Sequence, residues 1–196
     1  MIEVEKKFIL SDNDIERLTK EAEFLGERKM KDVYYDTKDF SLTRADTWLR
    51  LRGARLELKL PLRTDGGWHD QYRELETEAE IANELRLNAQ GQLEEELKEA
   101  GYEAFAEFIT TRQKYKKGDF TIDLDEVDFG YKIGEIELMV NDQSDMPKAI
   151  EKITNFAKEM GLTMAPVRGK LIEYLRRNSP QHYQALIDAG VIWTSY

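Results

Sequence analysis

The sequence has no cysteine and only two histidines, and these absences exclude several kinds of chemistry. Without cysteine, disulfide bonds and thiolate catalysis are excluded. His69 and His182 are far apart in the sequence, so a zinc site is not expected. The chain also lacks an apolar run of membrane-spanning length, and its first residues carry charge where a signal peptide is apolar. We therefore expect a cytoplasmic protein that makes no contact with a membrane.

The chain also has fewer basic than acidic residues. It contains 29 lysines and arginines and 39 aspartates and glutamates, which gives a formal net charge of -10. Proteins that bind nucleic acids usually present a basic surface, so we expect no nucleic-acid partner. A small anion held in a local basic pocket stays compatible with this charge. A chain of 196 residues can bury its own core, and we expect a single domain over residues 1–196 that acts as a monomer.

The sequence patterns predict about eight antiparallel strands and several helices. A strand opens the chain, and Ile15, Leu18, Ala22 and Leu25 then recur at helical spacing until Gly26. Further strands are expected over residues 29–37, 48–52, 56–60, 68–78, 108–116, 120–128 and 131–140. Two short helices with a break near Gly91 are expected within residues 79–101, followed later by helices from Asp145 and over residues 169–178 and 180–190.

Several of the predicted strands alternate charged and apolar residues. Successive side chains of a strand point to opposite faces, so each of these strands has one charged face and one apolar face. The charged sets are Glu3/Glu5/Lys7, Arg50/Arg52, Glu57/Lys59, Arg112/Lys114, Asp123/Asp125 and Glu135/Glu137. The simplest interpretation is a charged face in water, and the pattern alone leaves this alternative open. If helices instead cover the apolar face of a curved sheet, the charged faces converge inside a closed sheet of about eight strands.

The charged residues are also sorted by sign, which favours the second alternative. Acidic pairs such as those of "DLD" and "EIE" suit a hard divalent cation such as Mg²⁺. Arginines on other strands suit the oxygens of phosphate groups. Carboxylates that hold a metal, next to cations that hold phosphate, are the arrangement that phosphoryl transfer needs.

The opening segment "IEVEKKF" fits the E-x-E-x-K signature of the CYTH family, whose members fold as triphosphate tunnel enzymes. The chain also resembles this family in "VYYDTKDFSLTRADTWLRLR", "LELK", "IDLDEVDFGYKIGEIE" and "GKLIEYLRRNSPQHYQAL", and resembles it less over residues 61–110. The resemblance implies an α+β fold: a closed antiparallel eight-stranded β-barrel, the triphosphate tunnel, with flanking and C-terminal helices.

The resemblance also implies roles for individual residues. The implied metal ligands are Glu3, Glu5, Asp123, Glu135 and Glu137, with Mg²⁺ as the expected cofactor and Mn²⁺ as an alternative. The implied substrate-binding residues are Lys7, Arg50, Arg52, Lys59, Arg112, Glu135 and, from a C-terminal helix, Lys170. Glu5 and Lys59 are expected to act in catalysis, while the base that activates water is not assigned.

Other residues receive weaker predictions. Asp125 is expected to support a metal ligand or to bind a second metal ion. Glu74 lines the tunnel only if its strand turns the face that carries Glu74 toward the inside of the barrel. His182 is expected at the surface or at a helix end.

The expected reaction is the Mg²⁺-dependent hydrolysis of thiamine triphosphate to thiamine diphosphate and phosphate, since the chain resembles most closely the family members that act on this substrate. Trp48 has the same parity as Arg50, and an indole face attracts a cation such as the thiazolium of thiamine. The alternative role of Trp48 is hydrophobic packing. The alternative functions are an inorganic triphosphatase, a nucleoside triphosphatase, an adenylyl cyclase or a non-catalytic polyphosphate-binding module.

Overall fold

The computed structural model describes residues 2–61, 72–87 and 93–192, which form two compact units. Among these residues, unit 1 comprises 2–30 and 109–173, and unit 2 comprises 31–61, 72–87, 93–108 and 174–192. His69 and the expected break near Gly91 lie outside the described residues. The single domain over residues 1–196 stays a prediction.

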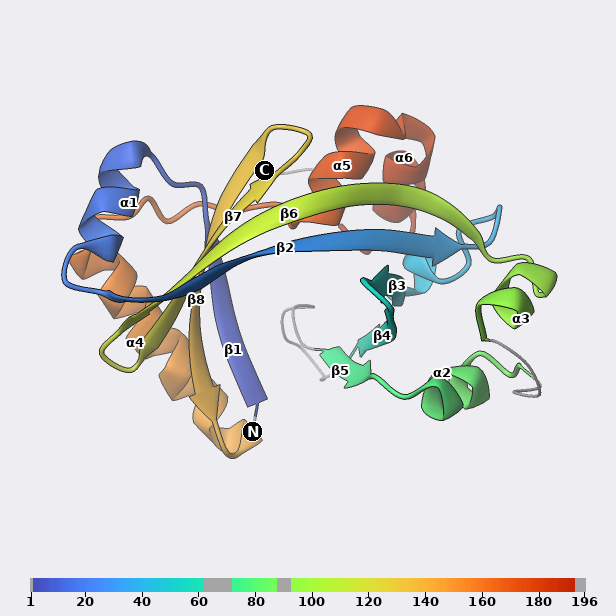
Figure 1. Cartoon of the computed structure of the whole chain (residues 1–196), viewed down its shortest axis with the longest axis horizontal. Helices are drawn as coiled ribbons and strands as arrows, with labels where there is room; N and C mark the ends of the chain where they lie inside the picture. The colour runs from blue at the N-terminus through green and yellow to red at the C-terminus, as the bar shows by residue number, and fades with distance from the viewer. Residues whose placement is uncertain (1, 62–71, 88–92, 193–196) are drawn as a thin grey trace. The chain divides into compact units, whose positions relative to one another are not determined.

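Eight strands and six α-helices make up the described secondary structure. The strand pairs β1–β8, β7–β8, β6–β7, β2–β3, β3–β4 and β4–β5 are all antiparallel. The strands are β1 (Ile2–Phe8), β2 (Glu23–Asp36), β3 (Trp48–Arg52), β4 (Arg55–Pro61), β5 (Tyr72–Leu75), β6 (Glu103–Lys117), β7 (Phe120–Val127) and β8 (Tyr131–Val140). The helices are α1 (Asp12–Thr19), α2 (Glu78–Glu84), α3 (Leu93–Glu99), α4 (Met146–Glu159), α5 (Lys170–Asn178) and α6 (Pro180–Asp188), with short 3₁₀ turns at Thr43–Ala45 and Gln143–Asp145. The α+β class is therefore confirmed (Figure 1).

The sheet is not a closed barrel in the described structure, which corrects the prediction. Its hydrogen-bonded strand order is β1-β8-β7-β6-β2-β3-β4-β5, so β1 and β5 stand at the two ends of the order. Closing an eight-stranded sheet requires its end strands to pair with each other. Among the described residues, β1 pairs only with β8 and β5 pairs only with β4.

In unit 1, helix α4 covers the apolar face of β1 and β8, as Figure 1 shows. Val4, Ile136 and Ile122 point to the same face of three neighbouring strands and pack against Ile153 of α4. Burying apolar side chains of this size stabilises a fold by about 1.5–3 kcal/mol each. The charged residues that alternate with them are thereby fixed on the opposite face of these strands.

Unit 2 repeats this arrangement with other elements. Leu49 of β3, Leu58 of β4 and Leu75 of β5 form one apolar cluster with Ile81 of α2 and Leu97 of α3. Since Leu75 belongs to this cluster, Tyr72 and Glu74 lie on the other face of β5. The structure thus settles the face of this strand, which the sequence left ambiguous.

Helix α1 is shorter than its apolar spacing predicts. Ser11 and Asp14 form the expected capping box, but the helix ends at Thr19. Glu21 has a positive φ of 59°, which interrupts the helix, and Leu25 already belongs to β2. Strand pairing of β2 with β6 therefore overrides the helical spacing of Ala22 and Leu25.

In the part of the chain that the structure describes, no helix combines the length and the apolar character that crossing a bilayer requires.

Candidate functional site

The charged face of unit 1 is built by strands β1, β8, β7 and β6. Their register places Glu5 opposite Glu137, Lys7 opposite Glu135, and Glu135 opposite Asp123. Paired residues of antiparallel strands point to the same face, so charged side chains far apart in the sequence become neighbours. The alternation that the sequence shows on single strands is thus continued across four strands.

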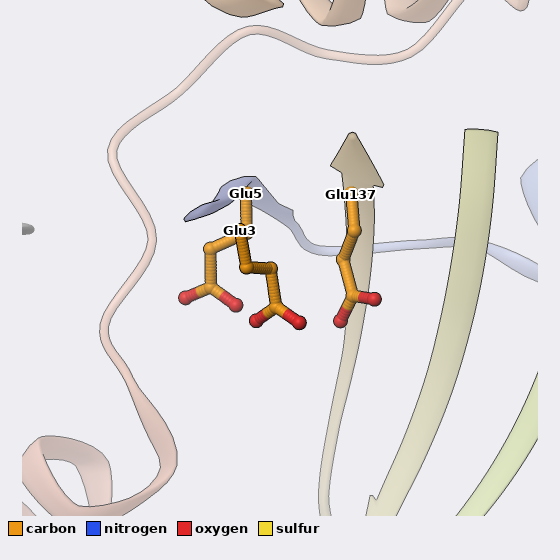
Figure 2. A group of neighbouring side chains, drawn as sticks. All are labelled: Glu3, Glu5 and Glu137. Atoms are coloured by element: carbon orange, nitrogen blue, oxygen red, sulfur yellow. The ribbon is translucent and has the colours of Figure 1, made fainter. Parts of the chain in front are cut away.

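Carboxylates gather in two groups on this face, and Glu137 belongs to both. Glu3, Glu5 and Glu137 form one group, and Asp123, Glu135 and Glu137 form the other. In each group, ligand oxygens of the three residues lie within 4.8 Å of one another. Figure 2 shows the first group, in which the three carboxylates lie side by side on β1 and β8.

Repulsion between the carboxylates changes the proton affinity of Glu137. Burial raises the pKa of this carboxyl, and the neighbouring charges of Asp123 and Glu3 raise it further, to about 8. The charges of Lys114 and Arg112 oppose this shift but do not cancel it. A carboxyl that holds its proton at neutral pH has too little positive charge around it.

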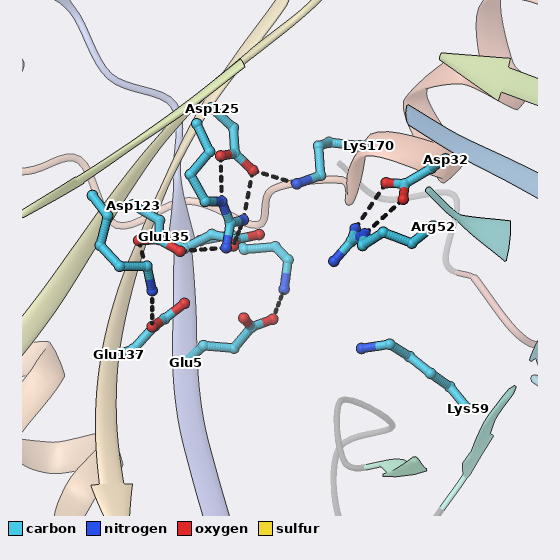
Figure 3. Close-up of polar contacts among 12 residues, drawn as sticks. Glu5, Asp32, Arg52, Lys59, Asp123, Asp125, Glu135, Glu137 and Lys170 are labelled. Carbon is cyan, nitrogen blue, oxygen red and sulfur yellow. Dashed lines mark hydrogen bonds and ion pairs between the residues drawn. The ribbon is translucent and has the colours of Figure 1, made fainter. Parts of the chain in front are cut away.

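Arg112 holds most of the other carboxylates together. Its Nε and Nη2 donate to the two oxygens of Asp125 at 2.6 and 2.7 Å, and Nη2 also donates to Glu135 at 2.6 Å. Its Nη1 donates to Asp123. Lys170, at the start of α5, donates to the same oxygen of Asp125 that accepts from Nη2, as Figure 3 shows for Asp125 and Lys170.

The positive charge on this face is therefore concentrated around Glu135. Burial raises the pKa of Glu135, but the charges of Lys170, Lys7 and Arg112 outweigh it and lower the pKa to about 2. Lys7 in turn donates to Glu5. Asp125 accepts from two cations and belongs to neither carboxylate group, so it orients Arg112 and Lys170 in this structure.

The residues around Glu137 fit a divalent cation. The named residues of this face are six carboxylates (Glu3, Glu5, Asp123, Asp125, Glu135, Glu137) and four cations (Lys7, Arg112, Lys114, Lys170). Asp123 Oδ1 is buried without a hydrogen-bond partner, although Lys114 Nζ forms an ion pair with it at 3.0 Å. Hard divalent cations prefer several carboxylate oxygens. A divalent cation matches both the excess of negative charge and this buried oxygen.

In unit 2, the arginines of β3 are paired with buried carboxylates of the two neighbouring strands. Arg52 lies opposite Asp32 of β2, and its Nε and Nη2 donate to the two Asp32 oxygens at 2.6 and 2.8 Å. Arg50 lies opposite Glu57 of β4, and its Nε donates to Glu57 Oε2 at 2.7 Å. Burial raises the pKa of Glu57, but Arg50, together with Arg52 and Arg55, outweighs burial and lowers this pKa. Figure 3 shows the pair of Arg52 and Asp32.

Lys59 and Trp48 occupy paired positions on the same face of β4 and β3. Lys59 forms an ion pair with Glu74 of β5. The Trp48 Nε1–H donates to Asp46 Oδ1 at 3.0 Å, and the Tyr72 hydroxyl donates to the same oxygen at 2.8 Å. The edge of the indole is thereby fixed, and Trp48 lies on the charged face and not among the apolar side chains of the other face.

The residues with predicted roles fall into two sets, one in each unit, and every one of them lies on a charged face or contacts it. Unit 1 brings together Glu3, Glu5, Lys7, Arg112, Asp123, Glu135, Glu137 and Lys170. Unit 2 brings together Trp48, Arg50, Arg52 and Lys59. Their roles in binding and catalysis stay predictions.

Sequence reasoning assigned no role to three carboxylates that contact these residues in unit 2: Asp32, Asp46 and Glu57. Glu57 shows the alternation of a charged strand face, but its partner depends on strand register. Asp32 and Asp46 show no such signal, because Asp32 has Met30 and Tyr34 as its neighbours on the same strand face and Asp46 precedes β3.

The prediction for His182 is wrong. This histidine is buried in unit 2, where its ring stacks on Phe40 at 3.8 Å between centroids and contacts Phe105 at 4.6 Å. Its Nε2 shares a hydrogen bond of 2.7 Å with the Thr43 hydroxyl. The sequence could not reveal this position, because the contacts join α6 to Phe105 of β6 and to Phe40 and Thr43, which lie more than a hundred residues earlier.

Comparison with known proteins agrees with this geometry. Residues 1–167 match the family model described as the CYTH domain. The chain is 35% identical to the thiamine-triphosphatases of Homo sapiens and Macaca fascicularis. Each alignment is 209 positions long and covers 97% of this chain and 91% of the relative. The solved structure of the PH1819 protein from Pyrococcus horikoshii OT3 is 25% identical, with a TM-score of 0.69 over 90% of this chain and 99% of that chain. This chain therefore belongs to the CYTH domain family.

Proposed function

We propose that this protein is a metal-dependent triphosphatase that hydrolyses thiamine triphosphate to thiamine diphosphate and phosphate. The observation that carries the proposal is the charged face of unit 1, where two carboxylate groups share Glu137 next to a cluster of cations. A site that only binds phosphate needs cations and does not need so many carboxylates. The name of the two relatives supports thiamine triphosphate as the substrate.

Glu3, Glu5, Asp123, Glu135 and Glu137 are the proposed ligands of the metal ion, and Mg²⁺ is the proposed metal. The donor set consists of oxygens, which suits Mg²⁺ or Mn²⁺ better than a soft metal. When bound, such an ion neutralises negative charge on the phosphate chain. Glu5 lies opposite Glu137 and is half-buried, so water can reach it, and we propose it as the carboxylate that contacts the attacking water.

The proposed phosphate contacts are Lys7, Lys170 and Arg112 from unit 1 and Arg50, Arg52 and Lys59 from unit 2. In phosphoryl transfer such residues hold the phosphate chain and stabilise the charge that spreads over the transferred group. Lys59 is proposed to touch the reacting phosphate, because its ammonium can donate to several oxygens from one position.

Trp48 is the proposed contact of the organic part of the substrate. Its indole edge is fixed by Asp46, and its face is a site for the permanent positive charge of a thiazolium. Inorganic triphosphate carries no such group, so Trp48 would contribute to the choice of substrate. That the chain acts as a cytoplasmic monomer stays a prediction.

The test is phosphate release from thiamine triphosphate, inorganic triphosphate and ATP, each with Mg²⁺, Mn²⁺ or a chelator. We expect release that needs a divalent cation and is fastest with thiamine triphosphate. Glu137→Gln should abolish this release. Glu126→Gln is the matched control, because Glu126 is exposed on β7 and pairs with Lys132 outside the two carboxylate groups.

The products separate the alternatives. An inorganic triphosphatase would release phosphate fastest from inorganic triphosphate, and a cyclase would release pyrophosphate from ATP. A binding module would bind triphosphates without releasing phosphate from any of them. Any of these three results would contradict the proposed function.

A further inference from the structure

Asp32 is a buried carboxylate to which the proposed function assigns no role. Its side chain is 0% exposed, whereas the side chain of its partner Arg52 is 22% exposed. The carboxylate therefore lies behind the guanidinium, and only the arginine reaches the surface of the charged face. Removing two charges from water costs about as much free energy as their attraction returns, so a buried ion pair contributes little to stability. A role in the site would explain why this pair is present.

The hydrogen bonds of Asp32 select one edge of the guanidinium. An arginine side chain has five N–H donors in a fixed planar fork. Asp32 accepts from Nε at 2.6 Å and from Nη2 at 2.8 Å, which occupies the side edge. The end edge, formed by Nη1 and the second hydrogen of Nη2, is left to bind another group. This end edge also has two parallel donors, the geometry that grips two oxygens of one phosphate.

Arg50 and Glu57 repeat this arrangement on the next strand. Arg50 donates through Nε to Glu57 at 2.7 Å, and its Nη2 lies 2.5 Å from the same oxygen. The Glu57 side chain is 3% exposed and the Arg50 side chain is 11% exposed. Two arginines of one strand are thus each held at the same edge by a buried carboxylate of a different neighbouring strand.

We propose that Asp32 is a positioning residue, which holds Arg52 by its side edge so that the end edge faces the triphosphate. Glu57 holds Arg50 by the same edge, and the Nη1 of Arg50 also donates to the Tyr34 hydroxyl at 3.5 Å, a contact that a phosphate oxygen would have to share or replace. This inference rests on the proposed function, because it takes the triphosphate as the ligand of both arginines. An arginine side chain that is already ordered loses less conformational entropy when it binds phosphate, and it holds the phosphate in one orientation.

The charge and the geometry of Asp32 have opposite effects on binding. Removing its negative charge strengthens the attraction of the site for an anion, while releasing Arg52 weakens the orientation of the phosphate. Affinity is therefore expected to change little and turnover to change much. A role in stability alone would move neither parameter in the folded protein, and a role as a mere negative charge would tighten binding without lowering turnover.

The experiment compares Asp32→Asn with the wild-type chain. An asparagine keeps the shape but can accept only one of the two hydrogen bonds, because its amide nitrogen is itself a donor. With thiamine triphosphate and Mg²⁺, we expect kcat to fall about tenfold and KM to change less than about threefold. The matched control is Glu107→Gln, which removes the carboxylate of an exposed ion pair with Lys31, the neighbour of Asp32, and should leave both parameters unchanged.

A double-mutant cycle tests whether Asp32 acts through Arg52. Arg52→Lys removes the fork, and we expect it to lower kcat at least about fivefold more in the wild-type chain than in Asp32→Asn. Multiplicative losses in the double variant would overturn the proposal, and so would an unchanged kcat in Asp32→Asn. If Asp32→Asn does not fold, the cycle of Glu57→Gln with Arg50→Lys decides by the same criteria.

Failure of the proposed function would be visible separately. In that case the wild-type chain would release no phosphate from any triphosphate. Calorimetric titration with inorganic triphosphate in the presence of a chelator then measures the affinity of the wild type, Asp32→Asn, Arg52→Lys and the double variant. Loss of affinity in Arg52→Lys that disappears in the Asp32→Asn background would still support positioning, and equal losses in both backgrounds or no binding at all would overturn it.

Discussion

Glu5 and Glu137 lie directly opposite each other on the paired strands β1 and β8, and both belong to the same group of three carboxylates. Like charges at directly opposed positions of a sheet destabilise it. Two metal ligands that repel each other lower the stability of the metal-free protein until the ion binds. The pair is therefore explained by metal binding and not by a contribution to the stability of the fold.

We expect Glu137→Gln to raise the thermal stability of the metal-free protein and to abolish the additional stability that Mg²⁺ gives the wild-type chain. The repulsion by Asp123 and Glu3 forces Glu137 to keep a proton in the folded metal-free protein that it releases in the unfolded chain, and glutamine removes this cost. The substitution also removes a ligand from both carboxylate groups. Thermal unfolding with and without Mg²⁺ checks both effects, with Glu126→Gln as the control. A variant that still gains stability from Mg²⁺ as the wild type does would contradict the metal role.

Lys170→Met is expected to raise KM for every triphosphate about tenfold while lowering stability by no more than about 1 kcal/mol. The stability loss is small because Asp125 keeps two hydrogen bonds from Arg112 after Lys170 is removed. Steady-state kinetics and urea unfolding measure the two quantities. Lys132→Met, which removes the cation of an exposed ion pair with Glu126, should change neither. An unchanged KM in Lys170→Met would remove this lysine from the proposed phosphate contacts.

Trp48→Ala is expected to lower kcat/KM for thiamine triphosphate more than for inorganic triphosphate. An indole face attracts a cation by about 0.5–2 kcal/mol, which corresponds to a selective loss of about three- to thirtyfold. Trp48→Phe keeps an aromatic face but loses the hydrogen bond to Asp46, so it should retain part of the preference. Equal losses on both substrates would show that Trp48 serves packing.

His182 makes stability depend on pH in a direction that its pKa defines. Burial lowers the pKa of His182, and the opposing charge of Asp36 does not restore it. The unfolded chain therefore binds a proton more readily than the folded chain as pH falls below about 6.5. The contribution of the neutral His182 to the free energy of unfolding is therefore complete above about pH 6.5. It is lost as the pH falls through the lower pKa that His182 has in the folded protein.

The corresponding measurement is urea unfolding of the wild type and His182→Gln between pH 8 and pH 5. We expect the advantage of the wild type to be largest at pH 8 and to shrink toward pH 5, because glutamine does not titrate. An advantage that stays constant over this range would refute the link to protonation and leave the stacking on Phe40 and the Thr43 hydrogen bond as its cause.

The sequence predicted the charged faces well because alternation is a local property of each strand. Residues 131–140 form β8 with the expected bounds, and Glu135 and Glu137 share a face with Glu5. Register was not predictable in the same way, since nothing in β2 marks Asp32 as the partner of Arg52. Pairing between distant strands is set by the packing of the whole sheet and is not encoded in any one segment.

The errors have the same origin. Ala22 and Leu25 continue the helical spacing of α1, but β2 takes up this segment and pairs with β6. His182 looked like a surface residue because its partners Phe40 and Thr43 are distant in sequence. The closed barrel was implied by resemblance to the family, and the described strands do not pair β1 with β5.

The pairing of β1 with β8 also determines when the carboxylate groups can assemble on the ribosome. Strand β1 is synthesised long before β8 and has to wait until residues 134–140 have emerged before it finds its partner. During that time the nascent chain carries an unpaired strand, and such strands tend to aggregate. Glu3, Glu5 and Lys7 place charge at every second position of this strand, which opposes pairing with a neighbouring nascent chain. The same three side chains that would later serve the metal and the phosphate can therefore protect the newborn protein.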